Sequence, residues 1–222
     1  NFFMEIAKLR AARMVYAQIA EAYGASEAAR KLHVFARTSA FTKTVYDPYV
    51  NILRTTTEAF SGVVGGVDAM EVAPLDEPFG SSEELTRRIA RNIRVMMQEE
   101  FNLTQPVDPA GGSWYVETLT AQLAVSIWAY FQNIESKGGI ESAILSGALQ
   151  DDVAATLAQR FKNLDTRTDR AVGVNMYANV LEQKLDRPAA KAVPAPAGPA
   201  VITAKPIEAH RWTERYEALR AK

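Results

Sequence analysis

Two short apolar segments, each followed by a longer amphipathic one, constrain the fold of this chain most strongly. Leu32–Ser39 alternates apolar with polar residues, which predicts a strand, and Tyr46–Val64 repeats its apolar residues at helical spacing. Ala69–Pro74 predicts a second strand, and the helix after it is expected to begin at Ser81, with Glu84 completing a capping box. Strands that alternate with helices indicate an α/β fold with a parallel sheet, either open and doubly wound or closed into a barrel with its helices outside.

Helical periodicity also extends to either side of these two units. Phe2–Tyr23 predicts a first helix that Gly24 ends, although Arg10 and Arg13 interrupt its apolar stripe. A long helix is expected to carry its apolar stripe over Val116–Ile134. Two short helices and a segment that is either a final strand or an extended tail follow (Ile140–Ser146, Asp151–Phe161 and Ala171–Tyr177).

A sheet of so few strands leaves backbone donors and acceptors unpaired at both edges. We therefore expect the remaining strands to come from an upstream part of the same protein or from another chain. The isolated chain is expected to be poorly soluble or oligomeric, because it exposes those edges and the apolar helix faces.

The composition excludes several classes of protein. The 222 residues carry 25 basic and 26 acidic side chains and no basic stripe interleaved with aromatics, so we do not expect nucleic-acid binding. No apolar run reaches the roughly 20 residues that a membrane span needs. The chain has no cysteine, which excludes disulfides and thiolate metal sites and fits a cytoplasmic protein.

Candidate polar groups gather along the two predicted strands. Successive side chains of a strand point to opposite faces, so Arg37 and Glu71 are expected to share the face away from the helices. They form either a buried ion pair or the lining of a channel for a polar ligand. The carboxyl ends of the strands, where barrel enzymes place their working groups, carry four more candidates (Thr38, Ser39, Asp76 and Glu77).

Other candidate motifs are less specific. The turn Gly111–Ser113 precedes the long helix and is either an anion-binding turn or a plain connection. His33 and His210 lack the paired spacing of a metal site, so no metal is expected. The sequence has no P-loop, nucleophile-elbow or zinc-protease motif.

The last part of the chain differs in composition. Five of the ten prolines lie in an Ala/Pro-rich run, which predicts a semi-rigid linker over residues 186–207. Residues 208–222 are expected to form a short helical tail, and residues 1–185 to form the α/β domain.

Several segments, in this order and spacing, resemble the methylmalonyl-CoA mutase family: NFFMEIAKLRAAR, ARTSAF with KTVYDPYVNILRTTTEAF, GGVDAMEVAPLDE, RRIARNIRVMMQEE and VDPAGGSWYVETLT. The resemblance covers roughly residues 1–185 and implies that they form the C-terminal half of the family's (β/α)8, TIM-type substrate barrel. A CoA ester threads such a barrel and adenosylcobalamin caps one end, and the family rearranges carbon skeletons, as between methylmalonyl-CoA and succinyl-CoA, through an adenosyl radical. The Pro-rich run then resembles the start of the linker to a cobalamin domain.

The resemblance also assigns residues near the cofactor. The catalytic subunits carry His-x-Gln-Thr-Ser where this chain has Phe35-Ala36-Arg37-Thr38-Ser39, and His-Thr-Asn-x-x-Asp-Glu where it has residues 71–77. The acid that holds the adenosyl ribose maps to Glu77, whereas the partner amide is replaced by Ala73. The implied cofactor-binding positions are therefore Arg37, Thr38, Ser39, Glu71, Ala73, Asp76 and Glu77, and no catalytic or metal-binding residue is carried over.

These departures from the catalytic pattern resemble the family's small, non-catalytic subunit, whose barrel supports a catalytic partner. A divergent or split active mutase is the alternative. The resemblance implies an acyl-CoA substrate and a complementary large subunit or cobalamin-binding domain as partners. Adenosylcobalamin would be bound mainly by parts outside this chain.

Overall fold

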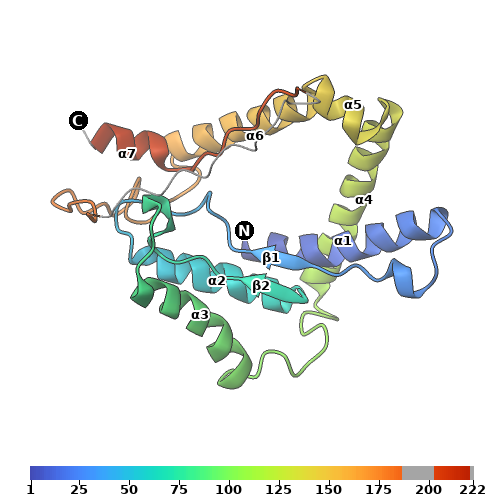
Figure 1. Ribbon diagram of the computed structural model, residues 1–222, viewed down its shortest axis with the longest axis horizontal. Helices are drawn as coiled ribbons and strands as arrows, with labels where there is room; N and C mark the ends of the chain where they lie inside the picture. The colour runs from blue at the N-terminus through green and yellow to red at the C-terminus, as the bar shows by residue number, and fades with distance from the viewer. Residues whose placement is uncertain (187–202, 221–222) are drawn as a thin grey trace. The chain divides into compact units, whose positions relative to one another are not determined.

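The computed structural model describes residues 1–186 and 203–220 (Figure 1). The elements of this part are α1 (Phe2–Ala22), η1 (Ala28–Arg30), β1 (Phe35–Arg37), α2 (Val50–Val64), β2 (Ala69–Glu71), η2 (Glu77–Phe79), α3 (Glu84–Glu99), α4 (Trp114–Ser136), α5 (Gly139–Leu145), α6 (Ala148–Asp165) and α7 (Glu214–Arg220). The chain divides into two compact units. Unit 1 comprises residues 1–38, 55–73 and 88–133, and unit 2 comprises residues 39–54, 74–87 and 134 onward.

Strands β1 and β2 form a parallel pair in unit 1. Their register joins Phe35 with Ala69, Ala36 with Met70 and Arg37 with Glu71. The middle pair is partly buried and the pairs on either side are exposed, so the predicted alternation of faces is confirmed. The α/β prediction holds in this coarse form, although the described chain is mostly helical and its sheet has two strands.

Helices α2 and α3 cover one face of this strand pair in unit 1. Ala59 of α2, Val72 just after β2 and Met97 of α3 form an apolar cluster with Ala90, and each is at most 6% exposed. Met70 packs against the cluster from β2. The apolar residues of α2 and α3 therefore pack on the face of the strand pair that the strand alternation predicts.

Helix α1 packs against α2 in the same unit. The rings of Phe2 and Phe60 lie 5.4 Å apart between centroids. At the end of α2, a Cβ atom on Gly65 would lie 2.6 Å from Cδ1 of Leu9. The absence of a side chain at Gly65 therefore leaves room for Leu9 of α1 beside the end of α2.

Unit 2 holds α5, α6 and α7. Leu164 at the end of α6 forms an apolar cluster with Ala171 and Val174, and Trp212 and Tyr216 pack against it. The cluster joins segments about fifty residues apart in the sequence, on either side of the Pro-rich run.

Several predicted boundaries are wrong. Each strand has three residues, fewer than predicted. Helix α2 begins at Val50 instead of Tyr46, because Asp47 adopts a positive φ of 49° that no helix accommodates. The segment Ala171–Tyr177 is neither a strand nor an extended tail, because it folds into turns with a single isolated bridge.

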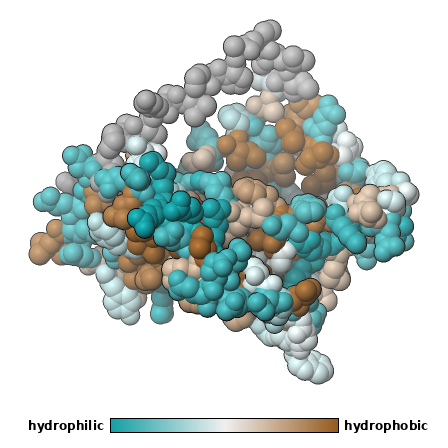
Figure 2. All heavy atoms as spheres, turned by 60° about the horizontal axis from the view of Figure 1, so that its bottom comes forward, coloured by the Kyte–Doolittle hydropathy of each residue, from teal (hydrophilic) through white to brown (hydrophobic). Residues whose placement is uncertain are grey.

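Large hydrophobic side chains also lie at the surface. Trp114 at the start of α4 is 90% exposed and Phe35 on β1 is 65% exposed. Figure 2 shows brown, hydrophobic side chains among the teal ones on the face that it displays. None of the helices in the described part of the chain is both long enough and apolar enough to cross a membrane.

The predicted linker over residues 186–207 lies mostly outside the described residues, which resume at residue 203. Helix α7 falls within the segment predicted as a helical tail and begins six residues after position 208.

Candidate functional site

Arg37 and Glu71 meet on the exposed face of the strand pair. Arg37 Nε donates to Glu71 Oε1 at 3.0 Å, and the side chains are 41% and 50% exposed. The ion pair expected from the strand alternation therefore forms, but within this chain it is not buried. An exposed pair contributes little stability, commonly below about 1 kcal/mol, so its position on the sheet face is its more informative property.

Thr38 and Ala73 meet where the two strands end. The Ala73 N–H donates to Thr38 Oγ1 at 2.9 Å, and the Thr38 N–H donates to the Glu71 carbonyl at 3.1 Å. Thr38 is 6% exposed and Ala73 is 1% exposed. The threonine hydroxyl thus extends the sheet ladder by one bond beyond the last strand residue.

The other three predicted residues belong to unit 2. Asp76 is fully buried, and its Oδ2 accepts bonds from the Glu83 N–H at 3.1 Å and the Thr86 hydroxyl at 3.0 Å. It therefore binds the start of α3, which begins at Glu84 and does not use Ser81 as its cap, contrary to the predicted capping box. Ser39 accepts the Phe41 N–H at 3.2 Å with its hydroxyl, and Glu77 opens the short helix η2.

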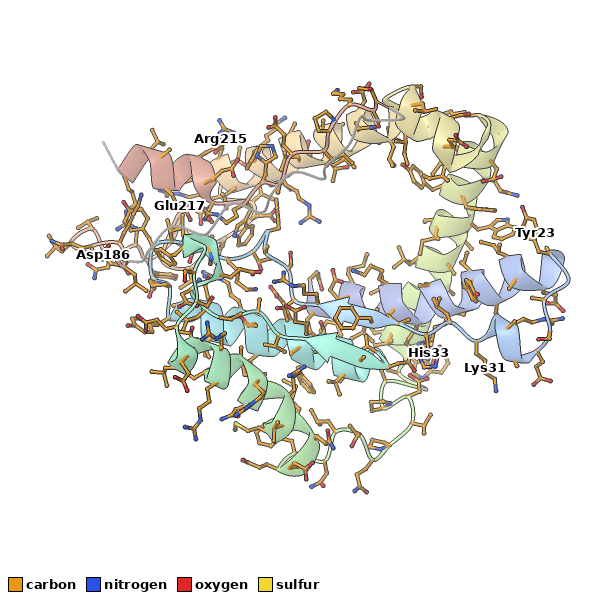
Figure 3. The ribbon with its side chains drawn as sticks, in the orientation of Figure 1. Tyr23, Lys31, His33, Asp186, Arg215 and Glu217 are labelled. Carbon is orange, nitrogen blue, oxygen red and sulfur yellow. The ribbon has the colours of Figure 1, made fainter. Side chains whose placement is uncertain are left out.

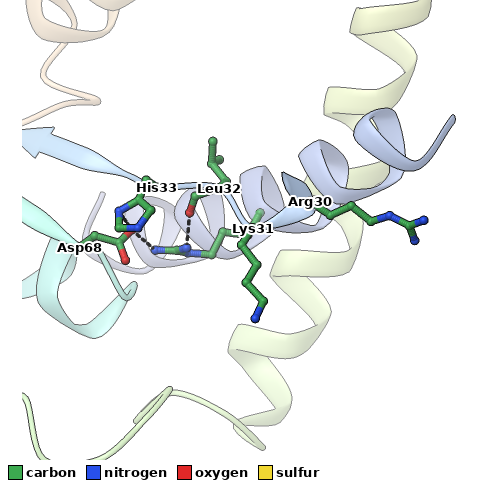
Figure 4. A pocket seen from close by; sticks show the side chains of 6 residues that line it. Arg30, Lys31, Leu32, His33 and Asp68 are labelled. Atoms are coloured by element: carbon green, nitrogen blue, oxygen red, sulfur yellow. Dashed lines mark hydrogen bonds and ion pairs between the residues drawn. The ribbon is translucent and has the colours of Figure 1, made fainter. Parts of the chain in front are cut away.

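A hollow of about 400 Å³ lies at the opposite, amino-terminal ends of the strands, within unit 1 (Figure 4). Arg13 enters it from α1 and donates to the Leu32 carbonyl at 2.6 Å and to Asp68 Oδ2 at 2.9 Å. Asp68 also accepts the Val34 N–H at 2.7 Å. The Val34 N–H and the Arg13 guanidinium hold the pKa of Asp68 below its usual value.

The rim of this hollow is basic. Lys31 and His33 lie on the connection that leads into β1 (Figure 3), and Arg30 pairs with Glu21 of α1. His33 Nδ1 is 3.9 Å from Asp68. Arg13 and Asp68 thus fasten α1 to the segments that lead into both strands.

Arg10 is the other charged residue that interrupts the apolar stripe of α1, and it also has partners in the structure. Its guanidinium donates to both carboxylate oxygens of Asp108, at 2.9 and 3.1 Å, and to both oxygens of Glu117, at 2.8 and 3.2 Å. Thr120 Oγ1 accepts a further bond at 3.2 Å. The sequence segments around Arg10 and Asp108 therefore form one structural joint, with α1 bound to α4 in unit 1.

This joint also decides between the two interpretations of the glycine turn. Glu117 Oε1 accepts the Gly112 N–H at 3.0 Å, so a carboxylate of the chain occupies the donor that an anion would use. The bonds from Arg10 and then from Gly112 hold the pKa of Glu117 below its usual value, and the two carboxylates raise the pKa of Arg10. Gly111–Ser113 is thus a connection that begins α4.

Sequence reasoning missed these anchoring residues. In the sequence, Arg10 and Arg13 interrupt an apolar stripe, and this interruption is the signal that they need partners. An arginine on a helix face that packs against other elements needs hydrogen-bond acceptors close to its guanidinium group. Their acceptors Asp108, Glu117 and Asp68 lie too far along the chain for spacing to identify them.

Comparison with known proteins decides the family. The family model described as methylmalonyl-CoA mutase matches residues 1–195 of the chain. The chain belongs to the methylmalonyl-CoA mutase family. It is 42% identical over 221 residues to the methylmalonyl-CoA mutase small subunit of Streptomyces virginiae, an alignment that covers 99% of the chain and 34% of that protein.

Two relatives from Porphyromonas gingivalis separate the family's two kinds of subunit. The methylmalonyl-CoA mutase small subunit is 37% identical over 99% of the chain and 36% of its own length. The large subunit is 34% identical over 84% of the chain and 26% of its own length. The chain thus spans about a third of the length of the curated small subunits that it matches.

Three of the positions predicted to bind the cofactor make their described contacts within the chain itself. Ala73 offers only a methyl group where the catalytic pattern has an amide, and its backbone N–H is bound by Thr38. Asp76 is buried against the start of α3. Arg37 is held in an ion pair with Glu71. A ribose needs hydrogen-bonding groups that converge on its hydroxyls, and these contacts bind the chain to itself.

Proposed function

We propose that this chain is part of an adenosylcobalamin-dependent acyl-CoA mutase, in which it forms a small-subunit-like segment of the (β/α)8 substrate barrel. A complementary chain or domain supplies the remaining strands, the cobalamin-binding domain and the catalytic groups. The alignments with small subunits cover 98–99% of the chain in three organisms, which supports the small-subunit assignment.

The contacts at the carboxyl ends of the strands carry this proposal. A chain that uses Thr38 to complete its own sheet and Asp76 to bind its own helix commits the Thr38 hydroxyl and one Asp76 oxygen to its own fold. Loss of the amide at position 73 removes a further hydrogen-bonding group. We therefore assign the chain the role of supporting a catalytic partner.

The exposed face of the strand pair supports the barrel interpretation. Phe35 is 65% exposed, and both charged residues of the last register pair face the same way. In a closed barrel this face turns inward and is covered by the other strands. The assembly would act on a branched acyl-CoA in the cytoplasm. A chain without cysteine suits the reducing conditions of that compartment.

A second candidate function is a subunit that only stabilises its partner and lines no substrate path. The cap-like roles of Thr38 and Asp76 favour it. Replacing Arg37 and Glu71 together with alanine in the reconstituted assembly separates the two. A lining role predicts a raised KM for the acyl-CoA, whereas a structural role predicts an unchanged KM and a weaker assembly.

Absorption spectroscopy tests the cofactor assignment. Adenosylcobalamin titrated into the full chain should leave the cobalamin spectrum unchanged, and titration into the chain bound to a large-subunit partner should shift it. A spectral shift with the chain alone, lost in a Glu77→Gln variant, would show that this chain holds the cofactor with its own residues.

A further inference from the structure

We propose that residues 208–220 act as a clamp that fixes the loop following β1, with Glu217 as the positioning residue at its centre. The loop is residues 39–47, and both segments belong to unit 2. More than 160 residues separate them in the sequence. The loop lies at the carboxyl end of a strand, the end at which barrel enzymes place their working loops.

Four contacts join the clamp to the loop. The Trp212 N–H donates to the Phe41 carbonyl at 3.0 Å, and the rings of these residues lie 6.5 Å apart. The Val45 N–H donates to Glu217 Oε1 at 3.0 Å. The Arg220 guanidinium lies over the Tyr46 ring, 3.9 Å from its centroid, and Arg211 Nη1 reaches the Lys43 carbonyl at 3.4 Å.

Glu217 is the group on which these contacts converge. It is 3% exposed and lies on α7 (Figure 3). Besides the Val45 N–H, its carboxylate accepts a bond from Thr213 Oγ1 at 2.8 Å and pairs with Arg211 Nη1 at 2.6 Å. A buried carboxylate is stable only while its partners remain in place, so undocking of the clamp and loss of the Val45 bond occur together.

Other bonds also hold the loop, since the Asp47 N–H donates to Glu182 Oε1 at 2.7 Å and the Lys43 N–H donates to the Ala40 carbonyl at 3.3 Å. Among the described residues, Thr44 bonds to Asn51 and Tyr46, but the Val45 N–H is bound only by Glu217. The clamp follows an Ala/Pro-rich run, so it reaches the loop as a separate segment of the chain. Docking of the clamp therefore adds the bond that holds the loop at Val45.

The alignments with small-subunit relatives extend over most of the clamp. The family model ends at residue 195, before the clamp begins. Alignments that cover 98–99% of the chain must nevertheless include most of it, and these are the alignments with small subunits. We infer that the clamp belongs to chains of this kind. The inference does not depend on the proposed mutase activity.

Thiol labelling tests the clamp, because the full chain has no cysteine of its own. A Val45→Cys substitution places a single buried thiol in the loop, and Val72→Cys places a reference thiol in the core of unit 1. Glu217→Ala should accelerate labelling of the loop thiol at least about tenfold and leave the reference thiol unchanged. Glu214→Ala is the matched control, since the side chain of Glu214 bonds to His210 and Arg211 within the clamp and to no loop residue among those that the structure describes.

Equal acceleration of both thiols would show general unfolding, and no acceleration of either would show that the loop holds itself. Both results overturn the clamp. If Glu217→Ala does not fold, urea replaces it with the two single-cysteine proteins otherwise unaltered. Low urea should then expose the loop thiol before the reference thiol, and simultaneous exposure would contradict the proposal.

Discussion

Unit 1 and unit 2 maintain their folds by different means. Unit 1 packs apolar helix faces on a parallel strand pair. Ion pairs from Arg10 and Arg13 of α1 join that helix to other segments of the unit. Unit 2 has a smaller apolar cluster and places hydrogen-bonded polar groups inside, among them Asn175 and Glu217. The difference shows that periodicity specifies the first kind of unit, whereas the second depends on individual polar contacts distant in sequence.

The largest predicted effect is in the polar interior of unit 2. Asn175 accepts the Ala171 N–H at 2.8 Å and donates to the carbonyls of Leu164 and Asp169 at 3.0 and 2.9 Å. Asn175→Ala removes these three bonds from a buried position and should destabilise unit 2 by about 4 kcal/mol. Hydrogen exchange resolved by segment measures the loss, with the exposed Asn179→Ala as control. A cost below about 1 kcal/mol would refute the comparison.

A slightly smaller effect is expected from the apolar core of unit 1. Met97 of α3 is 4% exposed and lies in the apolar cluster with Ala59, Val72 and Ala90. Met97→Ala should cost about 3 kcal/mol through lost burial and the cavity that remains. Met96→Ala, at a neighbouring position that is 39% exposed, should cost far less. Equal effects of the two substitutions in chemical denaturation would contradict the assigned core.

The joint between α1 and α4 should have a more modest effect. Arg10→Ala removes bonds to Asp108 and Glu117, whose side chains are nearly half exposed, and should cost about 1 kcal/mol. Arg10→Lys should recover only part of this, since an ammonium does not reproduce the fork geometry. Thermal unfolding compares the three proteins. Full recovery with lysine would show that charge alone matters at this joint.

The smallest effect concerns pH. The pKa of Glu117 is lower in the folded chain than in the unfolded one, so its contribution is present above pH 4.5 and is lost as the pH falls through the folded value. Arg10→Gln should therefore flatten the stability profile on the acid side and leave it unchanged near pH 7 apart from a constant offset. Identical acid limbs for both proteins would exclude this coupling.

The sequence predicted unit 1 more completely than unit 2. Alternation placed Met70 on the face that packs against the helices and Glu71 on the opposite face, because strand geometry depends only on neighbouring residues. It did not predict that Asp76 would bind the start of α3, since a nearer serine offered the usual capping pattern. It also gave no indication that Glu217 would bind the Val45 N–H, because that contact joins positions 172 residues apart.

The candidate site was predicted in part for the same reason. Strand register brings Arg37 to Glu71 and Thr38 to Ala73, and both pairings follow from two parallel strands of matched length. The bonds that bind Asp76 to the start of α3 required the structure. They show how Asp76 completes the fold, and the cofactor-binding role of the predicted residues stays a prediction.

Turnover of a branched acyl-CoA by a reconstituted assembly tests the central claim most directly. The full chain is combined with a large-subunit partner and adenosylcobalamin, and formation of the linear isomer is measured against each component alone. The account predicts no turnover by the chain alone, turnover by the assembly, and no more than about a twofold change with Glu77→Gln in this chain. Turnover by the chain alone, or loss of the assembly's activity in the Glu77→Gln variant, would contradict it.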